Sequence, residues 1–398
     1  MLMVMLATMA LSIGLTAIVR LVAWRWRIVD RPDTKRKFHK GRVPLWGGLA
    51  VYLAMVLGLL LALRHPQLAS QPLRDLAAAL IPAAGLACLF GALDDLWCFK
   101  SRRKLTLQFL SVLPLVAAGY SIDQIVVFGY PITLGWLGVP LTIVWLLGCI
   151  NALNLIDGMD GLASMVGLST AAMMGIIAVS MGNNHVAVIA IALAGALAGF
   201  LFYNFPPASI FLGDSGSTVI GLVVGILGIQ GAMKTSATLS ITTPAVIMTL
   251  PMFDVVMAVV RRKLTGRRFD AADAEHIHHV LLKRGLHPWQ VLGIIAALCL
   301  TTGAAATAAT VFRKDALAWI TAVTLVVLMI RLRLFGYYEF TLLKGALARL
   351  AARVLGDRVG GPSLREENEL LTQADDEDLV TAGNVVKVPA RKDHRKAA

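Results

Sequence analysis

The sequence predicts an all-α polytopic membrane protein, and three properties of the chain lead to that prediction. Of its 398 residues, 57% are hydrophobic and only 15% are charged, and the mean hydropathy is +0.73. Apolar stretches of the length that a helix needs to cross a bilayer recur along almost the whole chain. A water-soluble protein of this apolarity would have too few polar residues to cover its surface.

About eleven transmembrane helices account for these stretches. The chain is apolar from Met1, without a basic leader or a small-residue cleavage site, so we expect a retained first span rather than a removed signal. Residues 121–138 are rich in glycine and β-branched residues and favour a small surface hairpin. The predicted spans, with ends good to a few residues, are Leu2–Trp24, Pro44–Leu63, Leu76–Leu93, Leu105–Tyr120, Val139–Ile156, Leu162–Met181, Val186–Tyr203, Val219–Met233, Leu239–Val260, Trp289–Val311 and Ala316–Leu332.

Basic residues set the predicted orientation of these helices. Eight Lys and Arg residues lie in 25–43, four in 94–104 and seven in 261–288, and eleven spans bring all three loops to one side. Because an excess of Lys and Arg marks the cytoplasmic side, we expect the N-terminus outside and the C-terminus in the cytoplasm. The formal net charge of +13 is explained by this arrangement and calls for no nucleic acid partner.

The predicted organisation has three parts. Residues 1–335 form the transmembrane domain. Residues 336–360 hold an amphipathic helix that we expect on the inner leaflet, and residues 361–398 form an acidic and then basic tail of disordered composition. The four cysteines have neither metal-ligand spacing nor the pattern of a disulfide framework.

The densest concentration of chemistry lies in Asn151–Ala163, which reads N-A-L-N-L-I-D-G-M-D-G-L-A. Asn151, Asn154 and Asp157 follow one another at steps of three, so a helix presents them on one face. Asp160 comes next, and the glycines end the helix and let backbone approach a ligand. Carboxylate and amide oxygens beside glycines suit a hard cation and a phosphate. The alternative is a helix end with Asn and Asp as turn residues.

Further acidic residues fall on the same predicted side. Asp94 and Asp95 stand at the inner end of a span, where ionisable residues are costly without a cation or a reaction to serve. Asp214, in G-D-S-G-S before a span, suits a cation ligand beside the N–H groups of a helix N-terminus. Asp254 in the ninth span either has a function or supports a neighbouring helix. A charged helix end and an N-cap are the alternatives for the first two motifs.

Histidines and basic residues complete the set. His276, His278 and His279 cluster in a basic loop without a partner cysteine, which favours phosphate binding or acid–base chemistry over a transition metal. Lys40 belongs to the basic segment Asp30–Gly48, whose final glycine pair permits tight helix packing. Carboxylates for Mg²⁺ and cations for phosphates are the parts that phosphoryl transfer requires.

These ordered motifs resemble the polyprenyl-phosphate N-acetylhexosamine-1-phosphate transferase superfamily of the glycosyltransferase family 4 type. The nearest resemblance is to the bacterial undecaprenyl-phosphate N-acetylglucosaminyl-1-phosphate transferases. It runs from about Asp30 to Gly285 and includes D-R-P-D, G-A-L-D-D, N-A-L-N-L-I-D-G-M-D-G-L-A, F-L-G-D-S-G-S and H-I-H-H. The resemblance implies an enzyme of the bacterial inner membrane with about eleven helices and a cytoplasmic active site.

The resemblance also implies a reaction. A UDP-N-acetylhexosamine and undecaprenyl phosphate give the lipid diphospho-sugar and UMP, with Mg²⁺ or alternatively Mn²⁺ as cofactor, as the first membrane step of a cell-surface polysaccharide. Asp94 or Asp95 would be the base near the lipid phosphate. The implied catalytic residues are Asp94, Asp95, Asp157, Asp160, His278 and His279, the substrate-binding residues are Lys40, Lys104, Asn151 and His276, and the metal ligands are Asp214 and Asn154.

Three other interpretations and the state of assembly stay open at this point. A muramoyl-pentapeptide transferase would carry a Pro-Ile-His-His-His type loop, whereas this chain has H-I-H-H. A nucleotide-sugar transporter would place its polar residues at the bilayer midplane, and a CDP-alcohol phosphatidyltransferase requires a differently spaced aspartate pattern with an arginine. A homodimer is compatible with the sequence.

Overall fold

The computed structural model describes residues 1–30, 42–127, 130–231, 242–265, 276–312 and 314–332, together with the single positions 345 and 347. The amphipathic helix and the charged tail predicted beyond residue 335, apart from those two positions, lie outside the described residues. Lys40 lies outside them as well.

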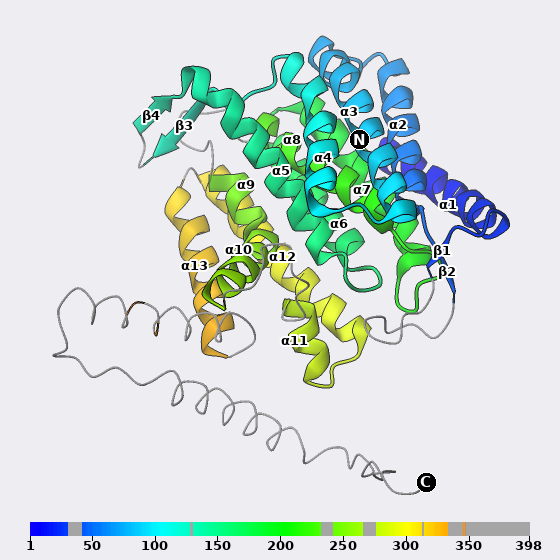
Figure 1. Cartoon of the computed structure of the whole chain (residues 1–398). Helices are drawn as coiled ribbons and strands as arrows, with labels where there is room; N and C mark the ends of the chain where they lie inside the picture. Colours follow the sequence, from blue (N-terminus) through cyan, green and yellow to red (C-terminus); the bar gives the residue numbers. More distant parts are fainter. Residues whose placement is uncertain are drawn as a thin grey trace, which may run out of the picture.

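The described residues form a helical bundle with two short antiparallel hairpins (Figure 1). Eight of its helices are long and apolar enough to cross a membrane. This confirms an α-helical polytopic membrane protein, while the predicted count of eleven spans and the predicted orientation stay predictions. The α-helices are α1 Leu2–Arg25, α2 Gly47–Arg64, α3 Gln71–Trp97, α4 Ser101–Ala117, α5 Gly138–Ile156, α6 Leu162–Ser180, α7 Asn184–Asn204, α8 Gly213–Gly231, α9 Thr242–Ile247, α10 Thr249–Leu264, α11 Ile277–Lys283, α12 Pro288–Phe312 and α13 Asp315–Arg331.

Helix α8 occupies the centre of the bundle. Every residue from Ser215 to Gly231 is buried, and α8 packs against α2, α3, α5, α6 and α7. Its glycines make this possible because they let neighbouring backbones approach closely. A Cβ atom added at Gly221, for example, would lie 2.5 Å from the Cα atom of Ile150 in α5.

Glycines of two other helices clamp the first turn of α8. A Cβ atom at Gly48 would lie 2.0 Å from the backbone nitrogen of Gly216, and one at Gly91 would lie 2.4 Å from the carbonyl oxygen of Asp214. The backbone nitrogen of Gly48 also donates to the carbonyl oxygen of Leu212 at 2.9 Å. The close packing predicted for the glycine pair at residues 47 and 48 is therefore confirmed, and it holds the start of α8 between α2 and α3.

Two helices are longer than predicted, and each includes a polar motif that was expected outside the span. Helix α3 runs to Trp97, so Asp94 and Asp95 occupy its last turns rather than a loop. Helix α8 begins at Gly213, so Asp214 belongs to its first turn. The polar residues that end and begin these helices are thereby held on rigid backbone.

The ninth predicted span is wrong as a single helix, because the structure has α9 and α10 with Met248 between them. Pro251 explains the break, since its ring clashes with the carbonyl of the residue four positions earlier, and that residue is Ile247, the last of α9. The strand pair β1 Val29–Asp30 and β2 Val43–Pro44 and the short helix α11 are additions that the sequence patterns did not predict.

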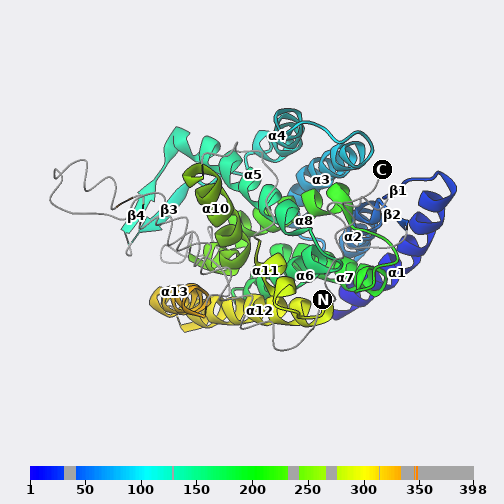
Figure 2. The same ribbon diagram turned by 60° about the horizontal axis from the view of Figure 1, so that its bottom comes forward.

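The hairpin expected within residues 121–138 is confirmed. Strands β3 Gln124–Val127 and β4 Tyr130–Thr133 pair antiparallel, with Ile125 opposite Ile132. In Figure 1 this hairpin projects at the upper left, whereas α11 lies at the lower end of the bundle. Figure 2 shows α13 and α12 along the lower edge and α1 along the right-hand side. The polar ends of α3, α5 and α8 meet at the end away from the hairpin.

Candidate active site

A cluster of charged side chains forms where α3, α4 and α8 meet. The ammonium group of Lys104, at the start of α4, donates to Asp214 Oδ2 at 2.7 Å and lies 3.1 Å from Asp94 Oδ2. One lysine thus joins two carboxylates that are 120 positions apart in the sequence. We call the following residues the aspartate cluster: Asp94, Asp95, Lys104, Asn154 and Asp214.

The two adjacent aspartates of α3 point to different partners. Besides its contact with α4, Asp94 accepts a hydrogen bond from the backbone nitrogen of Phe99 at 2.6 Å and is 6% exposed. Asp95 accepts from the backbone nitrogens of Asp214 at 2.8 Å and Ser215 at 3.4 Å. A carboxylate at a helix N-terminus satisfies unpaired N–H groups there and complements the helix dipole. Asp95 is therefore the cap of α8, supplied from another helix.

Asn154 ties α5 to the same point. Its amide nitrogen donates to Asp214 Oδ1 at 2.5 Å and to the hydroxyl of Ser217 at 2.9 Å. Because a carboxylate oxygen can only accept, the atom of Asn154 that faces it must be the nitrogen. The amide oxygen of Asn154 then keeps its lone pairs for another ligand. Asn154 and Asp214 are thus in direct contact, while their role as metal ligands stays a prediction.

The charge balance of the cluster favours a further cation. Burial acts to lower the pKa of Lys104, but the carboxylates of Asp214 and Asp94 outweigh it and raise the pKa, so Lys104 is charged at neutral pH. A single ammonium group then stands against the three aspartates of the cluster. Carboxylate and amide oxygens with excess negative charge are the ligands that Mg²⁺ prefers.

The turn after α5 adds two more carboxylates. Asp157 ends α5, and burial together with the negative charges of Asp214, Asp95 and Asp160 raises its pKa well above the ordinary value. Asp160 Oδ2 accepts a hydrogen bond from the backbone nitrogen of Ala208 at 2.9 Å. Asp160 therefore fixes the turn to the loop before α8, while Asp157 lies within electrostatic reach of the aspartate cluster.

Asn151 does not join the aspartate cluster, although the helix period puts it on the same face as Asn154. Its amide nitrogen donates to the carbonyl oxygen of Leu147 at 2.8 Å and to Gln108 Oε1 at 3.0 Å. Since the Leu147 carbonyl accepts only, the nitrogen of Asn151 is assigned, and Gln108 must present its oxygen to it. The amide nitrogen of Gln108 is then directed the other way.

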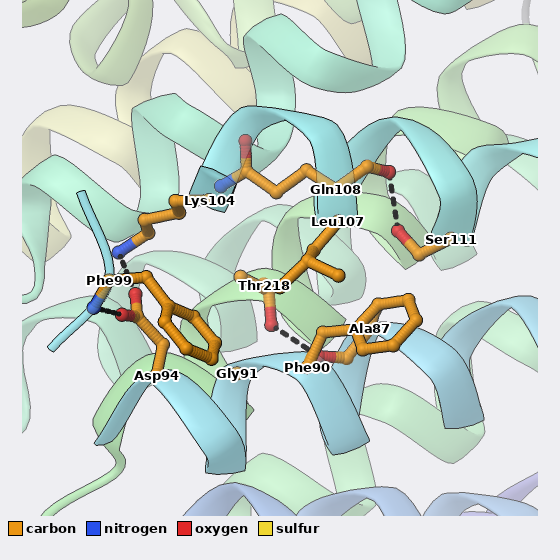
Figure 3. Close-up of a pocket in the computed structure, with 10 residues that line it drawn as sticks. All are labelled: Ala87, Phe90, Gly91, Asp94, Phe99, Lys104, Leu107, Gln108, Ser111 and Thr218. Atoms are coloured by element: carbon orange, nitrogen blue, oxygen red, sulfur yellow. Dashed lines mark hydrogen bonds and ion pairs between the residues drawn. The ribbon is translucent and has the colours of Figure 1, made fainter. Parts of the chain in front are cut away.

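Gln108 is a residue that the motif analysis missed. Its side chain extends along α4 toward Lys104 and lines a small pocket between α3, α4 and α8 (Figure 3). Asp94 and Lys104 form the charged end of this pocket, and Phe90 and Leu107 contribute carbon surface. Within the described part of the chain, the buried amide nitrogen of Gln108 has no hydrogen-bond partner. Its position four residues after Lys104, on the same helix face, is the one signal that could have pointed to it.

The histidine segment, residues 276–283, meets the same end of the bundle through α11. His278 is 1% exposed, and a Cβ atom at Gly158 would lie 2.6 Å from its Nε2 atom. Burial and the neighbouring imidazoles of His279 and His276 lower the pKa of His278 to about 3, so its ring is neutral. Both of its ring nitrogens lack a hydrogen-bond partner among the described residues. The ring centroid of His279 lies 4.1 Å from that of His278.

No group of three or more His, Cys, Asp or Glu side chains in the described part of the chain has the arrangement of a metal site. A divalent cation at Asp214 would thus need oxygen ligands from Asn154 and from a substrate. The phosphates of a nucleotide sugar are such ligands.

Comparisons with known proteins cover the part of the chain that carries the aspartate cluster. Residues 77–232, which run from α3 to the end of α8, match the model of glycosyl transferase family 4. The chain is 36% identical over 289 residues to a probable undecaprenyl-phosphate N-acetylglucosaminyl 1-phosphate transferase of Bacillus subtilis (strain 168), covering 70% of this chain and 77% of that protein. The chain belongs to glycosyl transferase family 4.

Other members of glycosyl transferase family 4 match at similar or greater length. The chain is 34% identical over 294 residues to decaprenyl-phosphate N-acetylglucosaminephosphotransferase of Mycolicibacterium smegmatis, covering 68% of this chain and 72% of that protein. It is 28% identical over 360 residues to undecaprenyl-phosphate alpha-N-acetylglucosaminyl 1-phosphate transferase of Escherichia coli (strain K12), covering 87% and 93%. The family predicted from the motifs is confirmed, and the protein is a membrane-embedded phosphosugar transferase.

Proposed function

We propose that the protein transfers N-acetylglucosamine 1-phosphate from UDP-N-acetylglucosamine to undecaprenyl phosphate and releases UMP. We further propose that it works at the cytoplasmic face of a bacterial inner membrane, as the first membrane step of a cell-surface polysaccharide. The observation that carries the proposal is the contact of Lys104 with both Asp94 and Asp214, at the end of a membrane-spanning bundle. The names of the relatives supply the sugar and the lipid.

The two carboxylates bound by Lys104 serve different substrates in this proposal. Asp94 lines the pocket whose walls include Phe90 and Leu107, which suits the phosphate end of a lipid. Asp214 stands beside Asn154 and the Asp157 turn, which suits the pyrophosphate of the donor. Lys104 lies between them and neutralises charge on both phosphates as they approach.

The transfer is a displacement at phosphorus. An oxygen of the lipid phosphate attacks the sugar-bearing β-phosphorus of the donor, the bond from that phosphorus to the bridging oxygen breaks, and UMP leaves with the bridging oxygen. A proton still on the lipid phosphate passes to Asp94, although a phosphate monoester with a second pKa near 6 is already largely ionised at neutral pH. We assign this role to Asp94 because it lines the pocket together with Lys104, whereas Asp95 is held at the N-terminus of α8 by two backbone N–H groups.

Asp214 and the amide oxygen of Asn154 would hold Mg²⁺ together with phosphate oxygens of the donor. When bound, the ion would polarise the β-phosphate and stabilise the charge that develops on the leaving group. Lys104 and the backbone N–H groups at the start of α8 create positive potential at the same place, whether or not the Mg²⁺ ion is bound.

The test uses the purified full-length chain in detergent, with undecaprenyl phosphate, UDP-N-acetylglucosamine and Mg²⁺. We expect UMP release that stops with EDTA and returns with added Mg²⁺ or Mn²⁺. Donors carrying N-acetylgalactosamine or N-acetylmuramoyl-pentapeptide separate this proposal from the muramoyl-pentapeptide alternative. Absence of UMP release with every donor would overturn the proposed function.

The assignment of the base has its own test. Asp94→Asn should reduce kcat, because an amide cannot take a proton from the lipid phosphate. Asp95→Asn should instead lower the stability, because the amide group is a weaker cap for α8 than a carboxylate. Full activity in Asp94→Asn would remove Asp94 from the mechanism.

A further inference from the structure

A buried carboxylate–imidazole pair joins α10 to the start of the histidine segment. Asp254 Oδ2 lies 2.9 Å from Nδ1 of His276, and Asp254 Oδ1 accepts a hydrogen bond from the backbone nitrogen of Ile277 at 3.2 Å. Asp254 is 1% exposed and His276 is 4% exposed. Both carboxylate oxygens are therefore directed at the N-terminus of α11.

The Asp254–His276 pair provides a cap for the N-terminus of α11, which the helix does not have from its own residues. His276 is the N-cap residue of α11, but its side chain makes no capping hydrogen bond to that helix. An isolated helix of seven residues is unstable in water, so α11 depends on contacts from elsewhere. Asp254 caps it from a different helix, and the residues that connect the two in sequence, 266–275, lie outside the described part of the chain.

The position of α11 in turn decides where His278 lies. The rings of His276 and His278 are parallel to within 4°, with centroids 6.0 Å apart. On its other side, His278 meets the backbone of Gly158, the residue after Asp157. The order of contacts is therefore Asp254, His276, His278 and then the turn that ends α5.

We propose that Asp254 is a positioning residue, which acts through His276 and the N-terminus of α11 to hold the His278 ring against the Gly158 turn. The role in transfer rests on the proposed function, because His278 is the member of this chain of contacts that faces the turn carrying Asp157. Neither ring nitrogen has a hydrogen-bond partner among the described residues, and the one that carries the proton of the neutral ring is held where it can donate to a phosphate oxygen of the donor. Asp254 itself touches no substrate in this proposal.

Two substitutions of Asp254 distinguish the effect of its hydrogen bonds from the effect of its negative charge. Asp254→Ala removes both hydrogen bonds to the start of α11. Asp254→Asn keeps both, because its oxygen can accept from Ile277 and its nitrogen can donate to His276, whose ring then carries its proton on Nε2. Val256→Ala, on the exposed face of the same helix at 51% exposure, is the matched control.

The first measurement does not depend on catalysis. Diethyl pyrocarbonate acylates accessible neutral imidazole, and mass spectrometry of the peptide that contains residues 276–283 assigns the site. We expect slow labelling of His278 in the wild type, in Asp254→Asn and in the control, and labelling about tenfold faster in Asp254→Ala, as local opening becomes easier. Equal labelling in Asp254→Ala and the wild type would overturn the proposal.

The second measurement is kinetic. With UMP release as the assay, kcat should fall about 100-fold in Asp254→Ala, as expected for a displaced site residue, with KM for undecaprenyl phosphate unchanged. Asp254→Asn should retain kcat within about tenfold of the wild type. Equal losses in the two variants would show that charge rather than position matters and would overturn the proposal. A wild-type protein without UMP release would contradict the proposed function alone, since the labelling result is independent of it.

Discussion

The aspartate cluster and the histidine segment lie at the same end of the bundle, but they differ in how their polar atoms are satisfied. Asp94, Asp95 and Asp214 accept hydrogen bonds from lysine, amide and backbone donors. His278 is buried, and neither of its ring nitrogens has a partner among the residues that the structure describes; an unsatisfied buried polar group costs about 1–3 kcal/mol. We infer that the aspartate cluster is organised before substrate arrives, whereas His278 gains its hydrogen-bond partner from substrate.

The strongest test of this contrast is Asp214→Ala. The substitution takes a partner from Lys104 and from Asn154 at once, and it removes the proposed cation ligand. We expect UMP release to fall about 1000-fold, the loss seen when a main electrostatic contact is removed from an active site. Asp75→Ala, at an exposed aspartate in the first turns of α3, is the control and should retain activity. Asp214→Ala with near-normal turnover would show that the cluster is only structural.

The helix packing that supports the aspartate cluster can be disrupted by a substitution that changes no charged residue. Gly48→Ala puts a methyl group 2.0 Å from the backbone nitrogen of Gly216, so α2 must move away from α8. We expect a loss of about 1–3 kcal/mol in stability, read as a lower unfolding temperature in detergent, together with reduced activity. Gly14→Ala is the matched control, because nothing lies within 4 Å of its added Cβ atom. Equal stability of the two variants would contradict the glycine clamp.

A smaller effect tests whether Asn151 binds substrate or orients Gln108. If Asn151 only orients its neighbour, Asn151→Leu and Gln108→Leu should each reduce kcat/KM about tenfold, the effect of about 1.4 kcal/mol from an unpaired buried amide. The double variant should then be little worse than either single one. A much larger loss in Asn151→Leu would favour direct substrate binding, as the resemblance to the transferase superfamily implies.

The smallest expected effect concerns pH and the histidine segment. Since the pKa of His278 is about 3 in the folded protein and about 6.5 in an unfolded chain, acid favours the unfolded state as the pH falls below 6.5. The loss between pH 6.5 and 5.5 should be about 1 kcal/mol. His278→Phe should show a weaker dependence of unfolding temperature on pH over this range than the wild type. Identical pH profiles would contradict the neutral buried ring.

The sequence predicted which polar residues come together better than it predicted the helix ends, while the roles of those residues stay predictions. Asp94, Asp157 and Asp214 could be assigned to one end of the bundle because each stands beside an apolar run whose direction alternates along the chain. The different tasks of Asp94 and Asp95 could not be predicted, since they depend on which neighbouring helix each side chain meets. Asp254 could be singled out as an ionisable residue in a span, but its partner His276 could not be predicted. Gln108 was missed for the same reason, because its partner Asn151 is distant in sequence. The break before Pro251 was predictable from the missing N–H and the clash of its ring.

The burial of α8 has a consequence for how the protein is made. Helices α1, α2 and α3 are synthesised well before α8, yet α2 and α3 make close contacts with its first turn. Before α8 has entered the membrane, the helix surfaces at residues 48 and 91 can contact only lipid or other helices that do not stay there. The bundle therefore closes late during synthesis, and the capping of α8 by Asp95 is among the contacts that complete the assembly of the transferase.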